Sequence, residues 1–112
     1  MAKTYIFKAV GKVGKVNIKA NRNIAKMWEE RDIQYCEVCS VLDSIEGGLG
    51  WVCLQATGNA HRHSRVWYRS RPELLWDFRQ VVRACQLSHS YIDSHGEIKE
   101  KVFFILRGKE IF

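Results

Sequence analysis

Cysteine and histidine are the residue types in this sequence whose spacing could support metal chemistry. Cys36 and Cys39 form a Cys-x-x-Cys pair, and Cys53 and Cys85 follow later in the chain. A tight turn of this kind aims two sulfurs at one ion, as in a zinc knuckle, whereas the alternative is a pair of buried thiols without a metal. No apolar stretch typical of a secretion signal precedes them, so we expect thiolate ligation rather than disulfides.

The histidines are candidates for proton transfer or metal binding. His61 and His63 lie two residues apart and would share one face of an extended strand, and His89 follows the last cysteine. Imidazole titrates near neutral pH, which suits a general base. The alternative for each histidine is an ordinary polar surface residue. We adopt that alternative for His95, because the neighbouring Gly96 indicates a turn.

Positive charge is concentrated in the N-terminal part of the chain. The 112 residues include 18 Lys and Arg against 12 Asp and Glu, a net charge of +6, and residues 1–31 account for this whole excess. A basic segment beside a neutral body indicates a polyanionic partner, most often nucleic acid, although a solubilising tail is the alternative. We expect a basic arm or hairpin over residues 1–20 and the folded domain over residues 21–112.

The overall composition excludes several classes of protein. Hydrophobic residues make up 46 % and charged residues 27 %, which is typical of a globular domain and not of a disordered or collagen-like chain. No apolar run approaches the roughly 18–20 residues of a membrane span. We therefore expect one small domain that works in the cytoplasm without contacting a membrane.

Hydrophobic periodicity predicts the elements that position these residues. Residues 4–19 alternate loosely between β-branched and basic residues and fit an edge strand, a hairpin or an extended arm. A helix capped by Asn21 or Asn23 should follow.

The remaining elements are predicted in the same way. Residues 51–56 have the composition of a strand, and Pro72 is well placed to open a helix whose apolar face extends to Val82. Residues 97–107 have helical spacing, and Gly108 would end that helix.

Taken in order, these motifs resemble the small HNH endonuclease family, especially its short phage-type members. The resemblance spans roughly residues 22–108 and is carried by Cys36-Glu37-Val38-Cys39, by Ala60-His61-Arg62-His63-Ser64-Arg65-Val66-Trp67-Tyr68, by Pro72-Glu73-Leu74-Leu75 and by Val81-Val82-Arg83-Ala84-Cys85-Gln86-Leu87-Ser88-His89. It implies an α+β fold, a small ββα-metal (HNH, treble-clef-like) domain with flanking helices and a basic N-terminal arm.

The resemblance also implies a function, that of a metal-dependent DNA endonuclease that hydrolyses phosphodiester bonds. His61 would act as the general base on water, and a divalent ion (Mg, Mn, Ni or Zn) would stabilise the leaving 3′ oxygen. The candidate metal ligands are His63 and His89 for this catalytic ion, and Cys36, Cys39 and Cys85 for a structural zinc.

Arginines surround the candidate base. Arg62, Arg65 and Arg69 flank His61 in the sequence, where a DNA phosphate must lie if cleavage occurs there. The alternative is an ordinary solvated face. We expect these three arginines to contact DNA.

The candidate catalytic site departs from the family at two positions. Ala60 stands where the family usually has a metal-binding Asp or His, so His63, water or a carboxylate such as Asp93 would have to complete the ion's shell. The Asn that orients the family's base falls near Arg79 or Gln80; the amide of Gln80 could substitute for it, whereas Arg79 could not.

The candidate zinc site departs at Ser88, which replaces the last cysteine of the second knuckle. A neutral hydroxyl is a poor zinc ligand, so Cys53 or a histidine would have to complete the site, or the site holds no metal. These losses leave a second function open: a catalytically degenerate HNH-like module that binds DNA or a protein, such as a phage regulator or host-defence antagonist. A basic treble-clef RNA-binding protein is a third.

Overall fold

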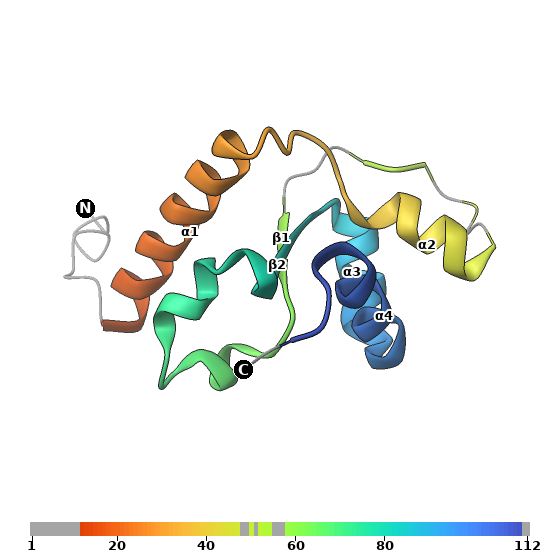
Figure 1. Ribbon diagram of the computed structural model, residues 1–112. Coiled ribbons are helices and arrows are strands. Elements are labelled where there is room, and N and C mark those ends of the chain that lie inside the picture. Colours follow the sequence, from red (N-terminus) through yellow and green to blue (C-terminus); the bar gives the residue numbers. More distant parts are fainter. Residues whose placement is uncertain (1–11, 48–49, 51, 55–57, 111–112) are drawn as a thin grey trace, which may run out of the picture.

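A computed structural model describes residues 12–47, 50, 52–54 and 58–110 of the chain (Figure 1). Within these residues the chain forms an α+β fold of four α-helices and one two-stranded antiparallel sheet. In chain order the elements are α1 (Lys12–Glu30), α2 (Val38–Glu46), β1 (Gly58–His61), β2 (Val81–Ala84), α3 (Gln86–Ser94) and α4 (Gly96–Arg107). Three short 3₁₀ helices connect the strands: η2 (Arg65–Tyr68), η3 (Pro72–Trp76) and η4 (Phe78–Gln80).

Helix α1 differs from the extended arm or hairpin predicted for its first half. Residues 12–19 are helical, while residues 1–11 lie outside the described part of the chain. Asn21 and Asn23, predicted to cap the helix, lie inside it. The helix therefore begins at Lys12, nine residues before the predicted cap Asn21.

The apolar face of α1 explains this difference. Ala20, Ile24 and Trp28 recur every four residues and are buried, and packing of one helical face outweighs the strand preference of isolated valines. Burial of a large side chain such as Ile24 stabilises the fold by roughly 1.5–3 kcal/mol. Val16 and Met27 pack beside this face, while Ile18 is half exposed among mostly polar residues. No helix among the described residues has the length and apolar character that crossing a membrane requires.

Strands β1 and β2 pair with Ala60 opposite Val82 and His61 opposite Val81. The helix predicted from Pro72 onward is therefore wrong in its second half. The chain makes two 3₁₀ turns and then enters β2. Val81 and Val82 point to opposite faces of the sheet and are both fully buried, an arrangement that a strand provides and one helical face does not.

Two further predictions had different outcomes. Residues 52–54, predicted within a strand, form none, and residues 51, 55 and 56 lie outside the described part of the chain. The predicted C-terminal helix is confirmed as α4. It ends at Gly108, whose φ of 79° favours glycine.

The sheet separates one apolar cluster from two others. Ala60, Val82 and Ala84 face a core that includes Leu42 of α2 and Phe103 of α4. Side chains on the other face of the sheet lie toward α1 and the 3₁₀ segment. Figure 1 shows α1 on one side of the strands and α2, α3 and α4 on the other. The functional residues thus lie where β1, α3 and the 3₁₀ segment meet.

Candidate functional site

Four cysteines from three parts of the chain converge at the start of α3. Cys36 precedes α2, Cys39 lies in its first turn, Cys53 belongs to the segment before β1, and Cys85 caps α3. Their Sγ atoms all lie within 4.8 Å of one another, and those of Cys39 and Cys85 are 3.5 Å apart. The cluster could hold a metal ion, and Cys53 is the fourth member that the sequence alone left open.

Ser88 lies against this cluster without belonging to it. Its hydroxyl is fully buried, 3.3 Å from the Cys85 sulfur and 3.4 Å from the Cys36 sulfur. Burial raises the pKa of the Cys85 thiol, but hydrogen bonds from the Ser88 side chain and backbone outweigh this effect and, with those involving Leu54 and Cys39, lower that pKa to about 6. The cluster therefore favours a thiolate at Cys85, the form that binds metals.

The predicted histidines meet at a second place, a pocket of about 420 Å³ beside β1 and α3. Its lining consists of Asn59, His61, His63, Ser64, Arg65, His89, Asp93 and Lys99. Four of the predicted site residues, His61, His63, His89 and Arg65, therefore line one pocket. The sequence did not single out Asn59 or Lys99, although Asn59 shares a strand face with His61.

His61 is oriented by a backbone carbonyl rather than by an amide side chain. Its Nε2 lies 2.7 Å from the Leu75 oxygen, and because a carbonyl only accepts, Nε2 carries the proton. The edge of Tyr68 packs against the imidazole with the ring centres 5.5 Å apart. Burial lowers the pKa of His61, although the bond to Leu75 opposes this. The neutral ring keeps Nδ1 as a proton acceptor.

His89 and Asp93 face the pocket from consecutive turns of α3. The His89 Nε2 lies 3.1 Å from the Asp93 Oδ2, and Lys99 donates to the other carboxylate oxygen at 2.8 Å. Strand β1 passes close to this pair, since a Cβ added at Gly58 would lie 3.2 Å from His89 Nδ1. The spacing of the pair along the helix places one imidazole and one carboxylate side by side.

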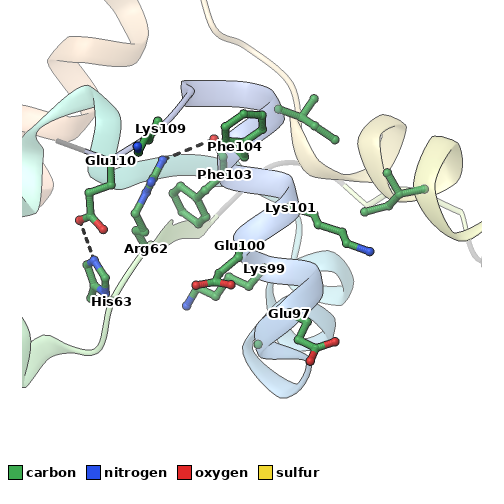
Figure 2. A pocket seen from close by; sticks show the side chains of 13 residues that line it. Arg62, His63, Glu97, Lys99, Glu100, Lys101, Phe103, Phe104, Lys109 and Glu110 are labelled. Carbon is green, nitrogen blue, oxygen red and sulfur yellow. Dashed lines mark hydrogen bonds and ion pairs between the residues drawn. The ribbon is translucent and has the colours of Figure 1, made fainter.

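His63 is engaged on the far side of the pocket. Its Nε2 lies 2.6 Å from the Glu110 Oε1 (Figure 2), and its ring stacks on Trp67 with centres 4.0 Å apart. Glu110 also accepts from the Gln80 amide at 2.9 Å, and these two bonds lower the pKa of Glu110 against the opposing effect of burial. Gln80 receives the Tyr68 hydroxyl at 3.0 Å.

The Leu75 carbonyl, rather than the Gln80 amide, orients His61. The Gln80 amide bonds to Tyr68 and Glu110. No sequence pattern marks Glu110 as a partner of His63, because the two residues lie 47 positions apart.

The three predicted DNA-contacting arginines have different surroundings. Arg62 donates from Nη2 to the carbonyls of Gly108 at 2.9 Å and Phe103 at 3.4 Å, at the end of α4 (Figure 2). Arg65 lines the pocket and donates to the Asn17 oxygen of α1 at 2.6 Å. Arg69 is exposed. Arg65 is thus the one of the three that lines the same pocket as His61.

A larger hollow of about 960 Å³ runs along α4 and shares His63 and Lys99 with the pocket (Figure 2). Its lining combines apolar side chains with polar and charged ones, and of the latter Arg62, His63 and Lys99 are bonded to other residues. Among the described residues, the cysteines form the only group of three or more His, Cys, Asp or Glu side chains gathered closely enough to hold an ion. The chain matches no protein-family model, no curated protein and no solved structure.

Proposed function

We propose that the protein is an HNH-like, metal-dependent endonuclease that hydrolyses phosphodiester bonds of DNA. The observation that carries the proposal is the pocket in which His61 of β1 lies with His89 and Asp93 of α3. A neutral imidazole, a helical pair of metal-binding groups and a neighbouring arginine are the parts that such hydrolysis needs. The chain order of β1, β2 and α3 supports a ββα-metal core.

His61 is the proposed general base. With Nε2–H held by the Leu75 carbonyl, Nδ1 takes a proton from a water molecule. The water oxygen forms a bond to phosphorus, the bond to the 3′ oxygen breaks, and that oxygen is protonated from solvent. Arg65 and Lys99 line the same pocket and neutralise charge on the phosphate. Tyr68 packs on the imidazole and limits its rotation.

His89 and Asp93 are the proposed protein ligands of the catalytic ion. One imidazole and one carboxylate 3.1 Å apart fit a divalent ion that keeps several waters. When bound, the ion supplies charge stabilisation to the phosphate and the leaving oxygen. Ala60 provides no ligand, and His63 would have to leave Glu110 to contribute one. The mixed donor set favours Mn²⁺ or Ni²⁺ over Mg²⁺.

Zinc is the proposed occupant of the cysteine cluster. Four sulfurs at tetrahedral corners about 2.3 Å from zinc are about 3.8 Å from each other. The four sulfurs here all lie within 4.8 Å of one another, which is compatible with such a site. The backbone N–H of Cys85 donates to the Cys36 sulfur at 3.2 Å, as expected for a thiolate acceptor. Zinc would fix the start of α3, the helix that carries His89.

Plasmid nicking tests the proposed function. We expect slow cleavage of supercoiled DNA in Mn²⁺ or Ni²⁺, which His61→Ala abolishes while DNA binding survives. His95→Ala is the matched control, because His95 is exposed and does not line the pocket. If wild type, His61→Ala and His95→Ala are equally inert in Mg²⁺, Mn²⁺, Ni²⁺ and Zn²⁺ while all bind DNA, catalysis is excluded and the degenerate binding module replaces it.

A further inference from the structure

The exposed face of α1 carries a row of cations. Lys15, Lys19, Arg22 and Lys26 recur at intervals of four, three and four residues, which places them on one side of the helix. All four are exposed. Within the described part of the chain no ion pair joins any of them to an acidic side chain. We call these four residues the α1 basic stripe.

The rest of α1 leaves this stripe facing outward. Ala20, Ile24 and Trp28 are buried on the opposite side, against η3 and β2. The acidic residues of α1, Glu29 and Glu30, both lie in its last turn, beyond the stripe. The stripe is therefore a row of four cations on a packed helix, with the Lys19 ammonium 5.5 Å from the centre of the Trp76 ring.

We propose that the α1 basic stripe binds the phosphate backbone of duplex DNA, an inference that rests on the proposed function for the identity of the substrate. Eleven residues of helix extend about 16 Å. Over that length one DNA strand presents about five phosphates, one every 3.4 Å along the axis. Four regularly spaced cations on a rigid rod match such a row of charges.

The buried apolar face argues against a membrane as the partner. A helix that binds a lipid surface inserts its apolar side among the acyl chains. In α1 that side belongs to the protein's own core, where Ala20 shares a buried cluster with Tyr68, and Ile24 shares one with Val81. The exposed surface of α1 is mostly polar and charged, with Ile18 half exposed.

The stripe and the candidate pocket lie on different sides of α1. Arg65 lines the pocket and donates to Asn17 of α1. Asn17 is about 200° around the helix from Lys15, on the side opposite the stripe. A duplex bound along the stripe therefore contacts a surface apart from the Arg65–Asn17 bond.

The test compares two double variants that remove equal charge from two exposed surfaces. Lys15→Gln/Lys26→Gln removes two lysines from the stripe, and Lys101→Gln/Lys109→Gln removes two from the α4 side of the molecule. Glutamine keeps helix propensity close to that of lysine, so α1 should remain folded, which circular dichroism checks. Binding to a short labelled duplex is measured by fluorescence anisotropy without added divalent ions, at about 50 to 200 mM salt.

We expect the stripe variant to reduce the salt slope by about 1.8 and to weaken binding roughly 10- to 60-fold near 0.1 M salt. The control should remain within about threefold of wild type. Equal weakening of DNA binding by both variants, or no weakening by the stripe variant, would overturn the inference. It would also be overturned if the stripe variant kept its affinity for DNA and lost affinity for anionic vesicles. Nicking by wild type is scored separately, so failure of the stripe and failure of the endonuclease proposal are distinguishable.

Discussion

Helix α3 connects two sites that are built in opposite ways. At its start, Cys85 joins three other cysteines whose sulfurs are already gathered, with Ser88 packed against two of them. One turn later, His89 and Asp93 lie side by side and would supply only half of a ligand set, and the neighbouring His63 is held by Glu110. A preassembled set of thiolates binds an ion tightly as part of folding, whereas an incomplete set exchanges its ion readily. On the proposed function, the cluster would have a structural role and the pocket a reactive one.

The largest effect should come from a buried cysteine. Cys39→Ser should release zinc and lower the free energy of unfolding by roughly 3 kcal/mol or more, a Tm decrease of about 10–20 °C. Emission spectrometry and thermal melting measure both quantities, with exposed Ser40→Ala as the control on the same helix. A protein that contains no zinc and melts identically after Cys39→Ser would show that the cluster is held by packing alone.

A substitution in the pocket should reduce activity and leave zinc content and stability nearly unchanged. His89→Ala should reduce Mn²⁺-dependent nicking by roughly 100-fold or more, because it removes half of the ion's protein ligands. Zinc content should be unchanged, and Tm should shift by only a few degrees. Retention of full activity by His89→Ala, or loss of zinc from it, would erase the distinction between the two sites.

The cleavage rate and the stability should both depend on pH through His61, because burial lowers the pKa of this residue below the ordinary value of 6.5. Cleavage needs the unprotonated ring, so the rate should rise with pH through the lowered pKa and be level above about pH 6.5. The contribution of His61 to stability is fully present above about pH 6.5 and is lost as pH falls through the folded-state pKa, because the unfolded chain takes up the proton first.

Thermal melting of wild type and His61→Gln against pH measures this contribution. The difference in Tm should change below about pH 6.5 and stay constant above it. A difference that is constant at every pH would contradict a buried neutral imidazole at this position.

The smallest effects concern Ser88. Ser88→Ala should cost about 1–2 kcal/mol of stability without zinc loss, because it removes a buried hydroxyl that contacts two sulfurs. Ser88→Cys should restore zinc to a Cys53→Ser variant, since residue 88 already lies beside Cys36 and Cys85. A double variant that remains free of zinc would show that position 88 cannot reach the ion.

The local parts of this architecture were accessible from the sequence, and the long-range parts were not. The helical spacing of α4 and its stop at Gly108 depend on neighbouring residues, as does the Cys-x-x-Cys turn. Val81 and Val82 were assigned to a helix because periodicity over a few apolar residues does not separate helix from strand. Their partner strand, β1, begins 23 residues earlier.

The candidate site shows the same division. The resemblance to the HNH family singles out His61 and His89 from the sequence, with Asp93 as a nearby carboxylate. The Leu75 carbonyl that holds His61 and the Glu110 carboxylate that holds His63 come from other parts of the chain. No local pattern marks them, because tertiary packing alone brings them to the pocket.

The most direct test is a titration of zinc-loaded protein with Mn²⁺, in which electron paramagnetic resonance measures the free ion. It asks whether α3 contributes to a second metal site, in the pocket, besides the cysteine cluster. We predict weak binding of one Mn²⁺ per chain, lost in His89→Ala and Asp93→Asn and retained in His95→Ala, with zinc content constant throughout. No Mn²⁺ binding by wild type, or binding unaffected by both pocket substitutions, would contradict the assignment of the pocket as the catalytic centre.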